Sequence, residues 1–375
     1  MRAGRPFGVY VHVPFCRERC DYCAFVTFVD RDHLMEAYAS ACASEIARAV
    51  DEEDLPPASS VYFGGGTPSR LPVDSLLAVL DAIPRTEDAE VTVECNPEDA
   101  APARLAAYRR GGVTRVSLGI QSTVGHVLAG LGRRHGAREG LDAAFAVGEG
   151  RFTSWNADLI FGGAGERDED WERSLGDLLD LASPPPHLSA YALSVEPATP
   201  LARCADRHPD EDAQARRYEQ TDRVLAAAGY RWEEISNWAL PGHGCRHNRL
   251  YWEQGEYRGI GAAAHSHRAG RRWRNVATPE RYVARISAGR DATAAVEVLD
   301  RSEQAFEALW LRLRTPGGVP TANLPADDAL SGLVEREGAT ATLTLRGRLL
   351  ANAVAARLDV GVCPEAPTGT IPRHA

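Results

Sequence analysis

Short hydrophobic runs recur along the first half of the chain, separated by segments with helical spacing. Apolar residues return every three or four positions in these segments, which predicts helices at 32–50, 73–83, 102–110, 137–148 and 168–182. The runs between them are typical of β-strands and lie at 9–13, 60–66, 90–97, 114–121, 154–162 and 187–195. Their spacing of roughly 25 to 40 residues is that of a βα unit, so the pattern predicts parallel strands.

Parallel strands of this kind close as a complete or partial barrel or lie as a doubly wound sheet, and both arrangements gather functional loops at the carboxyl ends of the strands. A further helix is predicted at 211–228, whereas the Trp- and Gly-rich stretch 230–273 has no clean period. From about residue 301 the pattern changes. Residues 302–314 predict an amphipathic helix, and 341–358 a strand that runs into a helix.

The change in pattern predicts a division of the chain into three parts. We expect a core at 1–285, a smaller C-terminal domain at 286–362 and a tail at 363–375, whose prolines and lack of periodicity are typical of disorder.

The amino-acid composition excludes several classes of function. The chain has 375 residues, 44% of them hydrophobic and 25% charged, which is the usage of a folded globular protein. Its net charge of -10 argues against generic binding of nucleic acid. All 42 basic residues are arginine, which excludes pyridoxal-phosphate enzymes and P-loop NTPases because both need a lysine. With no apolar leader or run of 18 apolar residues, we expect a cytoplasmic location.

Three of the eight cysteines, Cys16, Cys20 and Cys23, follow the first predicted strand with the spacing C-x3-C-x2-C. Thiolates suit zinc or an iron-sulfur centre. A structural zinc site needs four ligands, so zinc here would require a distant Cys245 or a histidine. A 4Fe-4S cluster on three cysteines leaves one iron open to a small molecule. Three unligated cysteines are the remaining alternative.

The segment YVHVPFCRERCDYCAF (10–25), followed by YFGGGTPS (62–69), resembles the radical S-adenosylmethionine (SAM) superfamily. Within it, the resemblance is to the branch that holds oxygen-independent coproporphyrinogen III dehydrogenases and the HemW heme chaperones. It implies a 4Fe-4S cluster whose open iron is chelated by SAM, and an α/β fold with a partial TIM-like (β/α)6 barrel and a smaller C-terminal α+β domain. An electron from the cluster would split SAM into methionine and a 5'-deoxyadenosyl radical.

The polar residues that match the family lie at the predicted strand ends, which share one face of a βα barrel. Glycines there let the backbone approach a ligand, and carboxylates can accept hydrogen bonds from an ammonium or ribose group. One departure is the turn DLIFGGAGE after the fifth strand, where relatives have Leu-Pro-Gly. The resemblance implies a SAM site formed by Tyr10, Tyr22, Gly65, Gly66, Thr67, Glu94, Gln121, Arg133, Asp158 and Ala192.

Two features separate the branches. The dehydrogenases carry a fourth cysteine two positions after the third, where this chain has Phe25. The segment CRHNRLYW (245–252) matches an HNxxYW motif that resembles a signature of the HemW group. We therefore expect heme contacts from His247, Asn248, Tyr251 and Trp252, with the His247 imidazole as axial ligand. The alternative is a hydrogen-bonded structural histidine. His187, outside the motif, is expected to take no part in heme binding.

The resemblance favours a heme chaperone that carries heme as cargo. Its expected partners are recipient hemoproteins, including membrane-bound respiratory proteins, and an electron donor such as a flavodoxin if SAM is cleaved. A homodimer and a peripheral position at the inner face of the membrane stay open. The alternatives are a coproporphyrinogen III dehydrogenase and a nucleic-acid-modifying radical SAM enzyme, which Phe25 and the acidic charge respectively disfavour.

Overall fold

Six parallel strands, joined by helical connections, form the core of the protein. The computed structural model describes residues 6–359. Adjacent strands pair in chain order, so the strand-helix pattern of the sequence is confirmed. The strands are β1 (Phe7–Val13), β2 (Ala58–Gly65), β3 (Arg85–Cys95), β4 (Arg115–Gln121), β5 (Ser154–Phe161) and β6 (His187–Ala192).

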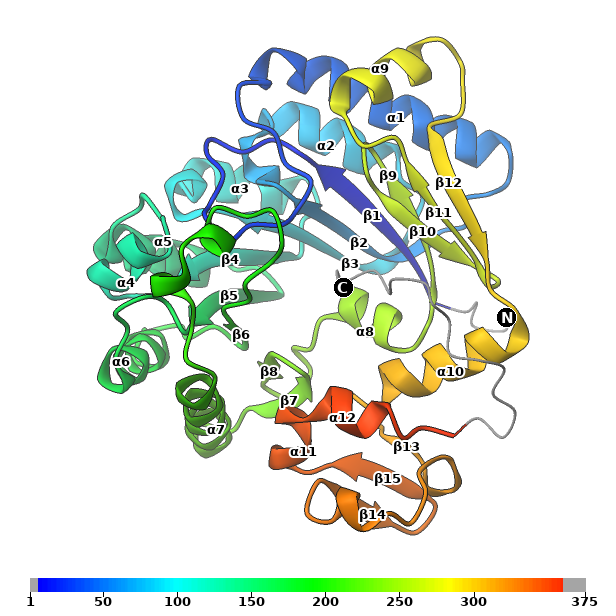
Figure 1. Cartoon of the computed structure of the whole chain (residues 1–375). Helices are drawn as coiled ribbons and strands as arrows, with labels where there is room; N and C mark the ends of the chain where they lie inside the picture. Colours follow the sequence, from blue (N-terminus) through cyan, green and yellow to red (C-terminus); the bar gives the residue numbers. More distant parts are fainter. Residues whose placement is uncertain (1–5, 360–375) are drawn as a thin grey trace.

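Helices cover the outer face of these strands (Figure 1). Their apolar stripes provide the reason: in the first helix Tyr38, Cys42 and Ile46 recur at helical spacing and are buried in the core. The helices are α1 (Met35–Asp51), α2 (Val73–Ala82), α3 (Pro102–Arg110), α4 (Gly125–Gly130), α5 (Ala137–Gly148), α6 (Asp168–Leu179) and α7 (Glu211–Ala227). Single-turn helices lie at η1 (Asp32–Leu34), η2 (Pro68–Arg70), η3 (Pro97–Asp99), η4 (Leu201–Arg203) and η5 (Ala205–Arg207).

The stretch without a clean period extends the sheet at both edges. β9 pairs in parallel with β1 and leads to antiparallel β10, β11 and β12, while β8 and β7 continue antiparallel from β6. Because β12 and β7 are the outer strands of the order, the barrel of the described residues is partial. These elements are β7 (Arg231–Glu234), β8 (Asn237–Ala239), α8 (Arg246–Trp252), β9 (Glu256–Ile260), β10 (His265–Arg268), β11 (Arg271–Asn275), α9 (Pro279–Ser287) and β12 (Thr293–Val298).

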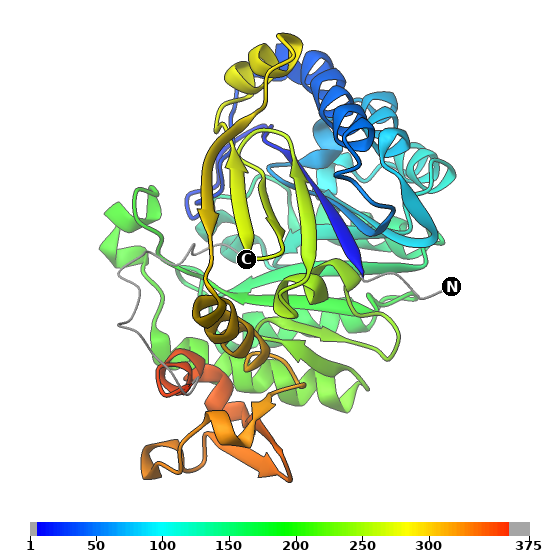
Figure 2. The ribbon, with the colours of Figure 1, turned by 90° about the vertical axis from the view of Figure 1, so that its right-hand side faces the viewer.

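The C-terminal elements form a second, small sheet with its own core (Figure 2). They are α10 (Arg301–Arg312), β13 (Val319–Pro320), η6 (Thr321–Asn323), η7 (Asp328–Leu330), β14 (Val334–Glu337), β15 (Thr340–Leu343), α11 (Leu345–Leu349) and α12 (Ala351–Ala355). Leu313, Ala341 and Val354 are fully buried in that core. The division at 286–362 stays a prediction, and β12, at its start, pairs with the large sheet. The predicted tail at 363–375 lies outside the described residues.

Two hydrophobic clusters support the barrel. One lies between β1–β3 and α1–α2, and the other between β4–β6 and α5–α7. They fix the helices against the strands and leave the strand ends to the loops. Across residues 6–359, no helix has the length and apolar character needed to cross a membrane.

Candidate functional site

The cysteine loop leaves the carboxyl end of β1 and is held by short backbone contacts. The Phe28 amide donates to the Pro14 carbonyl at 2.7 Å, and the Cys16 amide to the Phe28 carbonyl at 3.0 Å. His12 Nε2 lies 2.9 Å from the Val26 carbonyl oxygen, so this histidine supports the loop. All three cysteines, Cys16, Cys20 and Cys23, are free and half-buried.

Two residues from outside the loop reach the cysteine sulfurs: Thr67 follows β2, and Arg133 lies between α4 and α5. Thr67 Oγ1 donates to Cys16 Sγ at 3.7 Å, and Arg133 Nη1 to Cys20 Sγ at 3.4 Å. Arg133 is itself oriented by the Gly119 carbonyl at 3.2 Å. Burial raises the pKa of Cys16 to about 11, so without a bound cation this side chain stays a thiol at neutral pH. A soft cationic centre would deprotonate it.

Gly66 brings the second strand end close to the same loop. A Cβ at this position would lie 2.8 Å from the Phe15 carbonyl oxygen and 3.0 Å from Cys16 Sγ. Its amide donates to the Val13 carbonyl at 2.8 Å. Only glycine lets the backbone pack this closely. Gly66 therefore allows the end of β2 to lie directly against the cysteine loop.

The donor set fits a 4Fe-4S cluster. Three soft ligands share one loop, and an arginine and a hydroxyl donate to two of their sulfurs. Among residues 6–359, no three His, Cys, Asp or Glu side chains are grouped to hold a single metal ion. Zinc completed by Cys245 does not fit, because Cys245 contacts Glu90, which is aligned through Ser60 with Gly8 at the start of β1, whereas the cysteine loop follows the end of β1.

Two carboxylates lie inside the barrel beneath the strand ends. Glu94 accepts from the Tyr62 hydroxyl at 3.0 Å and from the Gly65 amide at 3.2 Å. Burial, and then the nearby Asp158, raise the pKa of Glu94 to about 7. Asp158 accepts from Ser117 Oγ at 3.1 Å, and burial raises its pKa as well. Such groups can accept from a cationic or hydroxylated ligand at little reorganisation cost.

The other residues implied for SAM lie on the strands and on the cysteine loop. Tyr10 points into the barrel and stacks on Tyr62, with ring centroids 6.3 Å apart. Tyr22 stands near Arg133 and Cys20 on the loop side. Gln121 ends β4 in the left-handed region at φ 68°, and Ala192 is exposed at the end of β6. Gln121 and Ala192 thus lie at strand ends and Tyr22 on the cysteine loop, whereas Tyr10 lies in the middle of β1.

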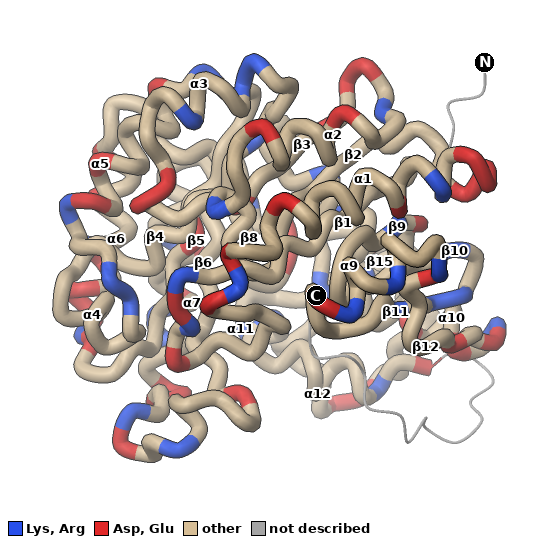
Figure 3. Tube along the Cα trace, turned by 90° about the horizontal axis from the view of Figure 1, so that it is seen from above, with Lys and Arg blue, Asp and Glu red and all other residues tan. Residues whose placement is uncertain are grey.

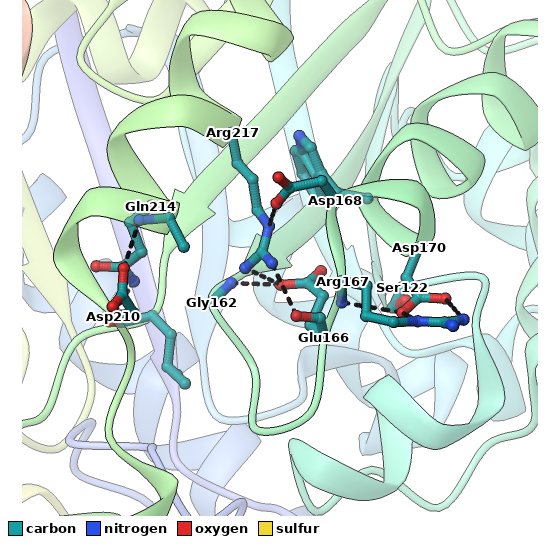
Figure 4. A network of polar contacts seen from close by, with 12 residues as sticks. Ser122, Gly162, Glu166, Arg167, Asp168, Asp170, Asp210, Gln214 and Arg217 are labelled. Carbon is teal, nitrogen blue, oxygen red and sulfur yellow. Dashed lines mark hydrogen bonds and ion pairs between the residues drawn. The ribbon is translucent and has the colours of Figure 1, made fainter.

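The unusual turn after β5 is fixed by a buried ion pair (Figure 4). The Gly162 amide donates to Glu166 Oε2 at 2.5 Å, and Arg217 Nη1 donates to the same oxygen at 3.1 Å. Arg217 belongs to α7 and also donates to Asp168 at 3.1 Å. The turn that replaces Leu-Pro-Gly is thus held against α7 by the ion pairs of Arg217.

The HNxxYW motif divides between two faces of α8. His247 and Tyr251 are four residues apart and share the inner face. His247 is fully buried; its Nδ1 lies 3.0 Å from Ser60 Oγ and its Nε2 lies 2.9 Å from the Tyr251 hydroxyl. Its ring stacks on Tyr62 at 5.3 Å, and burial lowers its pKa to about 3. Both ring nitrogens are therefore engaged within the protein.

Asn248 and Trp252, also four residues apart, line a cavity of about 580 Å³ on the other side of α8. Strands β7 and β8 and the turn after α10 form its other walls. His187, at the start of β6, lines it too. This placement could not be predicted from the sequence, because His187 lies some 60 residues upstream of the motif and belongs to no recognisable pattern.

In the arginine-rich segment 268–274, Arg268 and Arg272 form ion pairs. Arg268 contacts Asp54, and Arg272 lies 2.7 Å from both Glu297 and Glu307. In the view of Figure 3, acidic and basic residues are interspersed over the outer elements.

Known proteins are similar to this chain over nearly its whole length. Residues 10–178 match the Radical SAM superfamily. The heme chaperone HemW of Mycobacterium tuberculosis (strain ATCC 25618 / H37Rv) is 41% identical over 370 residues, 94% of each chain. HemW of Escherichia coli (strain K12) is 37% identical over 270 residues, 69% of this chain and 70% of that one. Coproporphyrinogen III oxidase (HemN) from Escherichia coli shares the fold, with a TM-score of 0.82 at 22% identity over 96% of this chain and 91% of that one.

Proposed function

The chain belongs to the HemW family of heme chaperones within the radical SAM superfamily, and on that basis we propose that it binds heme and delivers it to hemoproteins. The observation that carries the proposal is 41% identity to a HemW protein across 94% of both chains. The alternative, a coproporphyrinogen III dehydrogenase, has weaker support because the HemN structure is only 22% identical. Phe25 also replaces the fourth cysteine of that branch.

Cys16, Cys20 and Cys23 would hold the 4Fe-4S cluster. When bound, the cluster supplies an open iron for SAM and an electron for its cleavage. Arg133 donates to one cysteine sulfur and thereby offsets negative charge at the loop. The half-buried position of the loop restricts water at the sulfurs.

The SAM site would comprise the strand-end residues already described. Glu94 and Asp158 offer carboxylate oxygens inside the barrel, and Gly65 and Gly66 expose backbone close to the loop. Thr67 and Arg133 connect this surface to the cysteines. This support is geometric: apart from Tyr10 and Asp158, the residues implied by the family lie at strand ends or in the connections that follow them.

For heme, Asn248 and Trp252 face an open cavity and are the members of the motif best placed for contact. The expectation that His247 binds the iron stays a prediction. For that role, its ring would have to leave Ser60 and Tyr251. Tyr251 supports it from the same helix face.

The recipients, by the same proposal, are cytoplasmic or membrane-bound hemoproteins, respiratory proteins among them. An electron donor such as a flavodoxin would be required only if SAM is cleaved. A homodimer and a peripheral membrane position belong to the proposal as well, and binding of nucleic acid does not, given the net charge of -10.

The test begins with anaerobic reconstitution of the cluster, followed by separate titrations with SAM and with hemin. Incubation of the heme-loaded protein with an apo-hemoprotein should then transfer the Soret absorbance to the recipient. Absence of hemin binding at micromolar concentration would refute the chaperone function.

A parallel assay with coproporphyrinogen III, SAM and a reductant should yield no protoporphyrinogen, because Phe25 stands in place of the dehydrogenase cysteine. Product formation above a cluster-free control would move the assignment to the dehydrogenase.

A further inference from the structure

The cavity between α8, β7 and the turn after α10 contains a buried imidazole nitrogen with no partner. We propose that this cavity is the heme site and that His187 Nε2 is the iron ligand, an inference that rests on the proposed heme-binding function. His187 is 1% exposed, and its Nε2 has no hydrogen-bond partner among the described residues. A buried polar atom without a partner destabilises the folded protein unless a ligand supplies the missing interaction.

The tautomer of His187 is set by its neighbour. Nδ1 lies 2.5 Å from Asn156 Oδ1. The Asn156 amide is oriented by Asp158, because its Nδ2 donates to that carboxylate at 2.8 Å and a carboxylate accepts. Nδ1 therefore carries the proton and donates, which leaves the lone pair of the buried Nε2 unpaired among residues 6–359. Metal-binding histidines are held in this way by an acceptor on the other nitrogen.

Coordination through Nε2 needs no proton transfer. The lone pair enters an empty position on the iron, and the Nδ1 proton stays on its hydrogen bond to Asn156. Burial holds the pKa of His187 well below its usual range, so the imidazole is neutral and available at physiological pH.

The cavity has the size and the walls that a porphyrin requires. Its volume of about 580 Å³ lies within the roughly 300–1,000 Å³ common for cofactor-sized ligands. Trp232 and Trp252 supply aromatic walls from β7 and α8. The Trp232 indole nitrogen is a second buried atom without a partner among the described residues.

Charge at the cavity also suits heme. Arg231 and Arg312 line it, are exposed, and form no ion pair within the described part of the chain, so they can receive the two propionates. Arg249, Glu233, Glu234 and Glu253 line it as well, and Arg249 lies 3.6 Å from Glu233. Glu233 lies 3.9 Å from His187 Nε2, too far for a hydrogen bond. A ferric porphyrin core carries a positive charge, so this carboxylate favours it.

The other soft or basic side chains of this region are less suited to the iron. Cys245 lines the cavity, but burial raises its pKa to about 12 and its thiol donates to Glu90. The two nitrogens of His247 are both engaged on the far face of α8. Of these three residues, His187 is therefore the one that lines the cavity and keeps an unpaired nitrogen lone pair.

The test is a hemin titration of the full-length, cluster-reconstituted protein, with the Soret band and low-temperature EPR as readouts. We expect His187→Gly to shift the Soret band and to weaken hemin binding by at least about tenfold. Free imidazole added to the glycine variant should restore the wild-type spectrum, since it can fill the vacated space. A purely structural histidine would give no such spectral rescue.

His243→Gly is the matched control. His243 is half-buried on the loop before α8, contacts Ser154 Oγ at 3.1 Å and does not line the cavity. It should keep the wild-type spectrum. Arg231→Glu with Arg312→Glu should weaken hemin binding by about tenfold but leave binding of heme dimethyl ester unchanged, since the ester has no propionate charge.

The outcomes distinguish the proposed heme-binding function from the proposed His187 site. If the wild-type protein binds no hemin, the chaperone function and this site both fail. If it binds hemin and His187→Gly retains the wild-type Soret band and affinity, the site is refuted while the function stands. Loss of the band in His247→Ala but not in His187→Gly would place the iron at the motif histidine instead.

Discussion

Asp158 and His187 are bonded to opposite ends of one side-chain amide, that of Asn156. Asp158 Oδ1 accepts from Asn156 Nδ2 at 2.8 Å, and His187 Nδ1 donates to Asn156 Oδ1 at 2.5 Å. The first residue belongs to the proposed SAM site and the second to the proposed heme cavity. A single buried asparagine thus connects two ligand sites through fixed hydrogen bonds.

We expect Asn156→Leu to affect both sites. Leucine has a similar volume but neither orients Asp158 nor fixes the proton on His187 Nδ1. Removal of such a buried network should lower the unfolding free energy by about 1–3 kcal/mol and weaken binding of both SAM and hemin. Calorimetric titrations with each ligand measure this.

Thr221→Val is a control, because Thr221 is fully buried, accepts from the Trp171 indole nitrogen at 3.0 Å, and belongs to neither proposed site. It should cost stability alone. Unchanged SAM and hemin affinities in Asn156→Leu would show that the network does not connect the sites.

Each of the three cysteines should be indispensable to the cluster. Replacing Cys16, Cys20 or Cys23 by Ala removes one of the three soft ligands on the loop, and the reconstituted protein should lose its visible absorbance and EPR signal. Cys204→Ala, a half-buried cysteine outside the loop, should retain them. A triple variant that still binds about four irons and four sulfides would refute the ligand assignment.

Glu94 should make SAM binding depend on pH. Its pKa is raised to about 7, so its carboxyl is largely protonated below that pH and ionised above it. SAM carries a sulfonium charge, which favours the ionised form; affinity should therefore rise as the pH increases through about 7. Glu94→Gln should remove this dependence, whereas the exposed Glu36→Gln should keep it. A pH-independent wild-type affinity would contradict the role given to Glu94.

The same shift has an opposite effect on stability. The folded protein holds the Glu94 proton up to about pH 7, and the unfolded chain releases it near the ordinary glutamate pKa of about 4.3. The folded state therefore binds more protons between these values, and stability without ligand should fall as pH rises across them. Urea unfolding of the wild type and Glu94→Gln should show the contribution present below about pH 4 and lost above about pH 7.

We expect His247 to contribute to the stability of the fold through its buried contacts, apart from any role in heme binding. His247→Ala leaves Ser60 Oγ and the Tyr251 hydroxyl without their buried partner and opens space beneath Tyr62. We expect a loss of about 2–4 kcal/mol in the unfolding free energy. Tyr251→Phe removes one of these hydrogen bonds and should cost about 1 kcal/mol. Wild-type stability of His247→Ala would mean that its contacts carry no energy.

Much of the architecture could be predicted from local pattern. The six strands and their helices follow from runs whose periodicity is set within about ten residues, and parallel pairing follows from the length of the connections. The short strands β7 to β11 escaped detection because runs of three to five residues, rich in Arg, Trp and Glu, have too little periodicity to read. Their pairing depends on strands distant in sequence.

The sequence by itself determined that Cys16, Cys20 and Cys23 lie on one loop, since their spacing keeps all three within eight residues. It also predicted that Glu94 and Gln121 stand at strand ends, because parallel strands align those ends at one edge, while Asp158 lies inside β5.

Only the tertiary structure decided what the HNxxYW motif faces. Helical spacing pairs His247 with Tyr251 and Asn248 with Trp252, but the packing of α8 against β1 and β2 determines which pair is buried and which lines the cavity. The same packing brings His187 opposite the motif. Such contacts join residues about 60 positions apart, and no local pattern encodes them, because their free energy arises from surfaces that meet only when the chain has folded.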